Sequence, residues 1–249
     1  MKYTTSSCLI PYGVFIAALL FLGCSDTAHP HKVLLSKVTD NYGTITDLAY
    51  NGANQIVSIK KTSTSKSENT TLTYQGDSVI LDSGGETTVI KYENSLPTKQ
   101  YTFLKTKPDS VYFIKNFKHS NMLIASATFI TKDPGQPDSS VSYYTWNDGN
   151  VSQTNSKSYK YGGVSSEVTW INTFDKGRNF SNSDYLISFA LGFEGQLFVL
   201  CKNNIVGTKL SDNAINNCCY EYNYNSNQYP SAIKGIQLDT YTLEYIEPK

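Results

Sequence analysis

Short strands separated by tight polar turns recur along most of this chain, and this repetition constrains the fold more than any other feature. In each copy an alternating segment ends in an aromatic residue, a turn rich in Asn, Asp or Gly follows, and a second apolar strand begins. Two such segments joined by an Asn-Gly or Asp-Gly turn are typical of a β-hairpin. The turns lie at 51–54, 75–77, 93–95, 147–150 and 225–228, and a closing strand is expected at 240–245.

Consecutive hairpins with short turns predict that each strand pairs with its neighbours in sequence, in an antiparallel up-and-down meander. The aromatic residues are spaced too irregularly for a solenoid of identical repeats. We therefore expect an all-β fold whose sheet is strongly curled or barrel-like. The segment 183–191 is an exception, because a residue suited to cap a helix precedes a compact apolar run there, which predicts at most a short helix.

The amino terminus has the features of an export signal. Lys2 is the only charged residue before Asp26, and an apolar run from Cys8 to Leu22 lies between them. The run is shorter than the roughly 20 apolar residues of a membrane-spanning helix, and it contains Pro11. A removable signal peptide is therefore favoured over a transmembrane helix.

The sequence from Phe21 to Cys24 resembles a lipobox, the motif at which signal peptidase cleaves before a cysteine whose thiol has been acylated. This resemblance implies a lipoprotein signal peptide at 1–23, with lipidated Cys24 as the first mature residue. Ordinary secretion is the alternative, because Phe21 and Leu22 are not the residues that the motif prefers there. Ser25 in the second mature position is compatible with an outer-membrane lipoprotein of a Gram-negative cell.

The mature chain divides into a short polar tether at 24–32 and a single β-domain at 33–249. Two of the three histidines lie in the tether, where no cluster of Cys, Asp or Glu completes a metal site. Thr27 follows Asp26 in a triplet that looks like the O-glycosylation signal of some gut bacteria. It is the most accessible of three such triplets.

Composition excludes several classes of function. The formal charge is zero and Arg178 is the only arginine, so we expect no basic patch for nucleic acid. Glycine-rich phosphate loops and Cys-x-x-Cys pairs are absent, so no cofactor or metal is expected. Asp148 and Gly149 indicate a type I′ turn rather than a calcium loop. His119, the one histidine beyond the tether, is interpreted as a surface residue and not as a catalytic base.

Two carboxylates could still hydrolyse a glycoside, because such a site depends on a distance across the fold and not on local spacing. The candidate acids are Glu167, Asp175, Glu194 and Glu221. Acids are common at turns and surfaces, so we favour a protein that is not an enzyme over this alternative.

Three cysteines lie in the β-domain, at positions 201, 218 and 219. An exported protein can form disulfides, so Cys201 could pair with Cys218 or Cys219. The alternative is that all three are small buried apolar residues.

Three stretches resemble a family of gut-bacterial lipoproteins: Tyr144 to Val151, Lys202 to Asn204, and Tyr222 to Ile233. The resemblance extends over nearly all of 33–249. It implies a domain of unknown function with a porin-like β-fold and tyrosine-rich, YD-like hairpins, located in the cell envelope at the outer membrane. The family has no assigned activity and no catalytic residues to carry over.

A porin-like barrel need not span a membrane. The outer face of a spanning barrel is almost continuously apolar, whereas the predicted strands carry polar residues such as Lys60, Thr73 and Lys91. We therefore expect a water-soluble barrel, attached to the membrane through its lipid alone, with Leu, Ile, Val and Tyr packed inside.

The 19 tyrosines and two tryptophans admit two interpretations. Exposed aromatic rings stack on sugars or form protein interfaces, whereas alternate residues of a strand pair across the sheet. Trp146 and Trp170 are candidates for ligand stacking, although we favour a core role for both. Binding of a glycan, a protein or a small apolar ligand is the leading function. A hydrolase and a structural spacer are the alternatives.

The first prediction concerns lipidation. Mass spectrometry of the native amino terminus should find acylated Cys24, because the Gly23-Cys24 junction follows an apolar signal segment. Cys24→Ala should release the protein from the membrane fraction. A Cys24→Ala protein that stayed membrane-bound would contradict the prediction.

Overall fold

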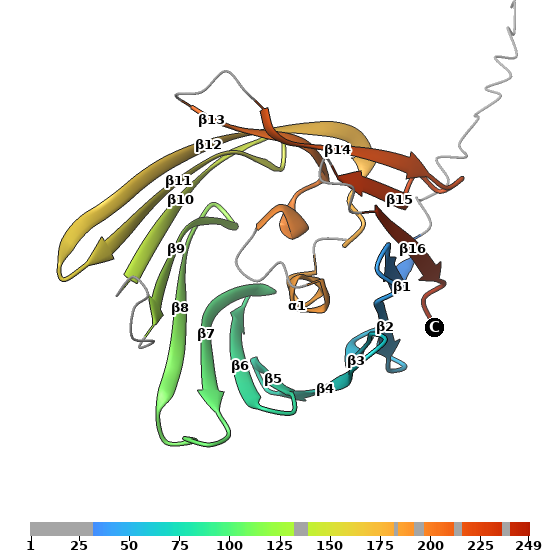
Figure 1. Cartoon of the computed structure of the whole chain (residues 1–249), viewed down its shortest axis with the longest axis horizontal. Helices are drawn as coiled ribbons and strands as arrows, with labels where there is room; N and C mark the ends of the chain where they lie inside the picture. Colours follow the sequence, from blue (N-terminus) through green and yellow to red (C-terminus); the bar gives the residue numbers. More distant parts are fainter. Residues whose placement is uncertain (1–31, 132–138, 182–183, 192–196, 212–215, 236–239) are drawn as a thin grey trace, which may run out of the picture. The chain divides into compact units, whose positions relative to one another are not determined.

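Sixteen strands close into one antiparallel barrel in the computed structural model (Figure 1). The structure describes residues 32–131, 139–181, 184–191, 197–211, 216–235 and 240–249. Each strand pairs with its neighbours in sequence, and β1 (Leu34–Asp40) closes the barrel against β16 (Thr240–Ile246). The expected all-β meander is confirmed, and its barrel is closed.

The remaining strands follow the chain order. They are β2 (Ile45–Tyr50), β3 (Ile56–Thr62), β4 (Ser67–Gln75), β5 (Ser78–Asp82), β6 (Glu86–Glu93), β7 (Leu96–Leu104), β8 (Val111–Ser120), β9 (Leu123–Thr131), β10 (Ser139–Asn147), β11 (Asn150–Lys160), β12 (Gly163–Arg178), β13 (Asn203–Leu210), β14 (Asn216–Tyr224) and β15 (Pro230–Gly235). The chain divides into two units, Met1–His31 and Lys32–Lys249, and the barrel is the second. The signal peptide, Cys24 and Thr27 lie outside the described residues.

Four hairpins turn through two residues that both have positive φ, as a type I′ turn requires. The turn between β10 and β11 is the expected one, with φ of 46° at Asp148 and 75° at Gly149. Asn94-Ser95, Asn121-Met122 and Tyr161-Gly162 adopt the same conformation. Met122 at φ 62° shows that the twist of the flanking strands can impose this turn on a residue that rarely adopts it.

The turn after β2 also forms the expected hairpin, but it is longer than the two-residue turns. Oδ1 of Asn51 accepts hydrogen bonds from the backbone N–H groups of Ala53 and Gln55, each at 3.0 Å. The positive φ falls on Asn54 and not on Gly52. The turns that begin at Asp40 and Asn225 have the same side-chain bonds to the second and fourth following residues. These side-chain bonds add to the backbone bonds of the same turns, such as the one from the Asn51 N–H to Gln55 O at 3.0 Å.

Near the end of five even-numbered strands, an inward-facing aromatic side chain bonds to the backbone of the preceding strand. In each case the acceptor is a carbonyl close to the start of that strand, so the bond ties the two ends of a hairpin together. The bonds are Tyr50 Oη to Leu35 O (2.6 Å), Tyr74 Oη to Ile56 O (2.9 Å), Trp146 Nε1 to Ile124 O (2.8 Å), Tyr222 Oη to Ile205 O (2.6 Å) and Tyr245 Oη to Pro230 O (2.7 Å). We call these bonds the aromatic clasps.

The inner face of the barrel is mainly apolar, with buried Leu, Ile and Val and partly buried Tyr side chains as expected, and buried polar residues such as Gln100 and Lys115 lie among them. The outer face carries ion pairs between neighbouring strands. Lys37 pairs with Glu244 at 3.3 Å. No helix among the described residues is long and apolar enough to cross a membrane.

The described residues between β12 and β13, at 179–181, 184–191 and 197–202, lie in the interior of the barrel, and together we call them the plug (Figure 1). It contains helix α1 (Ile187–Ala190) and a 3₁₀ helix (Leu197–Leu200), and its apolar side chains share one core with the strands. The short helix expected within 183–191 is confirmed. Asp184 precedes it and accepts the Leu186 N–H at 2.9 Å.

Polar contacts inside the barrel hold the plug against β7 and β8. Lys115, which is 1% exposed, donates from Nζ to Tyr185 Oη at 2.9 Å. The Tyr185 hydroxyl donates in turn to Gln100 Oε1 at 3.2 Å. The Phe117 ring meets the Tyr185 ring edge-on at 5.5 Å between centroids. A buried cation thus contacts a plug hydroxyl and aromatic faces, an arrangement that replaces part of its hydration.

The second prediction tests the aromatic clasps. Tyr74→Phe should lower the free energy of unfolding by about 1–3 kcal/mol, because it leaves a buried carbonyl without its donor. Tyr92→Phe is the matched control, since the buried Tyr92 hydroxyl has no hydrogen-bond partner in the described part of the chain. Urea denaturation should show that this variant is as stable as the wild type or more stable. Equal losses for both variants would contradict the role of the clasps.

Candidate binding site

The returning end of the plug is fixed to the turn between β10 and β11 by a reciprocal pair of asparagines. Asn150 donates from Nδ2 to Asn203 Oδ1 at 3.0 Å, and the Asn203 backbone N–H donates to Asn150 Oδ1 at 2.9 Å. The Lys202 N–H also donates to the Gly149 carbonyl at 2.9 Å. Two segments about 50 residues apart in sequence therefore form one rigid unit.

The entering end of the plug is bonded to the same returning segment. Asn179 donates from Nδ2 to Asn203 O at 3.0 Å, and Asn204 donates from Nδ2 to Arg178 O at 2.7 Å. Oδ1 of Asn204 accepts the Phe180 N–H at 3.2 Å. An amide side chain both donates and accepts, so these asparagines satisfy backbone groups that irregular chain would otherwise leave unpaired inside the barrel.

Asp175 lies at an irregularity in β12, where the register with β13 shifts between Phe174 and Arg178. Its Oδ1 accepts from the N–H groups of Gly177 and Asn204 at 3.0 and 3.1 Å. Its Oδ2 accepts from the Tyr224 hydroxyl. Burial and the Asp175 carboxylate raise the pKa of Tyr224 above its ordinary value. The Tyr224 ring packs on the backbone of Gly177, where a Cβ atom would overlap it.

A polar cleft of about 490 Å³ opens where these segments meet. Its walls come from the β10–β11 turn, the end of β12 and the residues that leave the plug. The lining residues are Asn147, Asp148, Asn150, Ser152, Asn172, Phe174, Asp175, Lys176, Lys202 and Asn203. Two carboxylates and two ammonium groups balance, so the lining carries no net formal charge.

The floor and the rim of the polar cleft differ. Asn150, Asn203 and Asp175 form the floor, and the hydrogen bonds described above fix them. Asp148 lies at the rim with its side chain 79% exposed, and Lys202 Nζ contacts its two oxygens at 3.1 and 3.2 Å. Asn147 and Lys176 are exposed rim residues, and within the described ranges their side chains make no hydrogen bond or ion pair.

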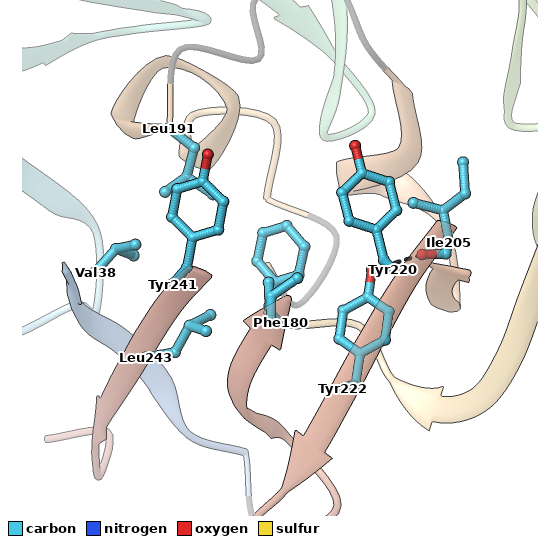
Figure 2. Close-up of a pocket in the computed structure, with 9 residues that line it drawn as sticks. Val38, Phe180, Leu191, Ile205, Tyr220, Tyr222, Tyr241 and Leu243 are labelled. Atoms are coloured by element: carbon cyan, nitrogen blue, oxygen red, sulfur yellow. Dashed lines mark hydrogen bonds between the residues drawn. The ribbon is translucent and has the colours of Figure 1, made fainter. Parts of the chain in front are cut away.

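A second cavity lies inside the barrel, between the plug and the wall (Figure 2). We call it the apolar pocket. Phe180 and Leu191 of the plug face wall residues from β1 and from β13 to β16, among them Tyr222, whose hydroxyl is held by Ile205 O. The lining residues are Val38, Phe180, Leu191, Ile205, Tyr220, Tyr222, Ile233, Tyr241 and Leu243. Its volume of about 30 Å³ is enough for one or two water-sized spheres.

The candidate acids do not converge on one cavity. Glu167 forms an ion pair with Lys157 at 3.1 Å, and Glu221 forms one with Lys234 at 3.7 Å; both pairs join neighbouring strands and are partly exposed. Asp175 reaches the polar cleft. Glu194 lies outside the described residues.

The two tryptophans have different surroundings. Trp146 packs against the core and donates its indole N–H in an aromatic clasp. Trp170 is half-buried on β12, where its strand partners are Thr154 on β11 and Leu210 on β13. Neither lines the polar cleft or the apolar pocket.

Cys201 and Cys219 are free thiols in the structure. Cys201 is fully buried, and burial raises the pKa of its thiol to about 12. It therefore behaves as a small apolar residue. Nothing is described of the Cys218 side chain.

His119 is not the exposed surface residue that its polar neighbours suggested. It is partly buried near the end of β8, and its Nε2 is buried without a hydrogen-bond partner in the described part of the chain. Lys118 before it is exposed, because successive residues of a strand face opposite sides of the sheet. Within the described ranges, no group of three or more His, Cys, Asp or Glu side chains could hold a metal ion.

The structural neighbours of this chain include two porin-like proteins. No family model and no curated protein sequence matches the chain. A porin-like protein from Bacteroides uniformis ATCC 8492 has 12% sequence identity and a TM-score of 0.58, with 88% of this chain and 98% of that chain covered. A porin-like protein from Bacteroides vulgatus ATCC 8482 has 11% identity and a TM-score of 0.58, with 86% and 99% covered. The likeness concerns the fold, which is a porin-like β-barrel.

Proposed function

We propose that this chain is an exported, lipid-anchored protein of the Gram-negative cell envelope that binds a polar ligand in the polar cleft and catalyses no reaction. The apolar signal segment and the Gly23-Cys24 junction support export and anchoring. The likeness of the barrel to porin-like proteins of two Bacteroides species supports an envelope location.

The polar cleft is the observation that carries the binding function. Its volume of about 490 Å³ lies within the range of about 300–1,000 Å³ that is typical of small-molecule sites. Its floor is already fixed by hydrogen bonds among Asn150, Asn203 and Asp175, so little ordering entropy opposes binding. Its rim offers Asn147 and Lys176 as polar groups for a ligand.

The outer face of the barrel supports attachment through the lipid alone. Cross-strand ion pairs such as Lys157–Glu167 and Lys234–Glu221 lie on it. A lysine facing lipid at the middle of a bilayer costs about 2–4 kcal/mol. A barrel whose outer face meets water avoids this cost.

The hydrolase alternative needs two carboxylates that can exchange protons with a substrate. In the polar cleft, Asp148 is held by Lys202, and Asp175 accepts three hydrogen bonds. Both therefore have structural partners. The arrangement favours binding over acid–base catalysis.

The apolar pocket favours a small apolar ligand less strongly. With about 30 Å³ of space, it would admit a ligand only after Phe180 or Leu191 moved, whereas the polar cleft is already open. A structural spacer is the remaining alternative, and it predicts that no small molecule binds.

The third prediction tests the polar cleft. The full lipidated protein in detergent is screened by ligand-observed NMR against mono- and oligosaccharides, amino acids, short peptides and small aromatic compounds. Ser152→Trp places a large ring in the cleft and should abolish binding of the polar hits. Thr73→Trp, on an exposed position of β4, is the matched control and should leave binding unchanged.

Other outcomes separate the alternatives. Hits that survive Ser152→Trp but are lost with Leu243→Trp would move the site to the apolar pocket. Turnover of any saccharide would overturn the non-catalytic assignment. Absence of binding across the whole library would favour the spacer.

A further inference from the structure

We infer that the ligand of the polar cleft is a neutral saccharide, with one sugar ring against Phe174 and its hydroxyl groups bonded to Asn147, Asp148 and Lys176. This inference rests on the binding function proposed above and names the class of ligand. It follows from four properties of the cleft: its charge, its donors and acceptors, its aromatic wall and the pairing of its strands.

The charges of the cleft select against an ionic ligand. Asp148 and Lys202 neutralise each other at 3.1 Å across the rim. Asp175 is directed into the protein, where three donors surround it. Lys176 is then the one ammonium at the cleft without an ion-pair partner in the described residues, and a single exposed charge binds an anion weakly in water. Tight binding of a phosphate or carboxylate commonly uses several cations or a bidentate arginine, and arginine is absent from the described residues that line the cleft.

The hydrogen-bonding groups of the rim match hydroxyl groups. A sugar hydroxyl donates one hydrogen bond and accepts others. The Asn147 carboxamide can both donate a hydrogen bond to this hydroxyl and accept one from it. The Asp148 carboxylate can accept a hydrogen bond from it, and the Lys176 ammonium can donate one to it. Lys202 contacts both oxygens of Asp148, so the acceptor is oriented before the ligand arrives.

Phe174 supplies the apolar surface that a sugar ring needs. Its side chain lines the cleft and is partly buried against the core, so the ring is held in place. An aromatic ring presents a flat apolar face, and the C–H groups on one side of a pyranose ring form a complementary one. Phe carries no polar group that would have to be desolvated.

The pairing of the strands excludes the usual recognition of an extended peptide. A peptide is commonly bound by adding a strand to a free sheet edge. The strands β10 to β13 around the cleft are each paired on both sides, because the barrel is closed. The backbone therefore offers no edge, and recognition must depend on the rim side chains.

The fourth prediction tests this ligand class by isothermal titration of the full protein in detergent. The probes are cellobiose, maltose, chitobiose and laminaribiose, with digalacturonic acid and tetra-alanine as charged and peptide comparisons. At least one neutral disaccharide should bind, and the two comparison compounds should not. Asn147→Ala, Lys176→Ala and Phe174→Leu should each weaken its binding by about tenfold.

Matched controls lie on β8, away from the cleft. Asn116→Ala and Lys118→Ala change the same residue types and should leave the affinity unchanged. Thermal unfolding of Phe174→Leu is measured in parallel, so that loss of fold is distinguished from loss of contact. Asn147→Ala and Lys176→Ala alter exposed side chains and keep the test decisive if Phe174→Leu unfolds.

Different results would overturn the proposal that the polar cleft binds a ligand and the proposal that this ligand is a neutral saccharide. If digalacturonic acid or the peptide binds and Ser152→Trp abolishes that binding, the cleft is a binding site but the saccharide class is wrong. A neutral sugar that binds equally well to all three variants would place its site elsewhere and overturn both proposals. If no probe binds, the saccharide inference is overturned, and the broader screen described above decides the binding function.

Discussion

Closure of a sixteen-stranded sheet creates an interior that side chains alone do not fill, and the rest of the structure follows from this constraint. Barrels of eight strands are filled by their inward residues, whereas sixteen strands leave a wide lumen. Here the chain supplies the missing volume itself, because the plug enters between β12 and β13 and shares its core with the wall. The apolar inward side chains of a strand such as β5 are therefore buried in this shared core.

A plug of irregular backbone brings polar groups into the barrel, and these groups need partners. Asn179 and Asn204 supply them at the two ends of the plug, and Asn150 and Asn203 fix its exit to a neighbouring turn. The polar cleft lies at this same place, where the regular pairing of β12 with β13 is interrupted and side-chain hydrogen bonds hold the chain. Its position is thus a consequence of how the plug is held, and its fixed floor has the same cause.

Much of the architecture could be predicted from local sequence, because hairpin turns and strand alternation are encoded by residues close together. The turn at Asp148 and the short helix near Ile187 are examples. The polar cleft could not be predicted in this way. Asn150 and Asn203 each lie in a recognisable motif, but their contact depends on the pairing of β10 to β13 and on the path of the plug. Glu167 and Asp175 share one strand yet differ in role, because the irregularity after Phe174 redirects Asp175 inward.

The abundance of tyrosine has a structural explanation that weakens its link to ligand binding. Tyr50, Tyr74, Tyr222 and Tyr245 use their hydroxyl groups to bind backbone carbonyls of the preceding strand, and their rings pack against the core. A phenol suits this role because one side chain supplies both apolar area and a donor. Core packing and the clasp bonds thus account for these four tyrosines, which composition alone would assign to an exposed binding surface. The proposed binding depends instead on a few polar side chains around Phe174, next to the register irregularity of β12.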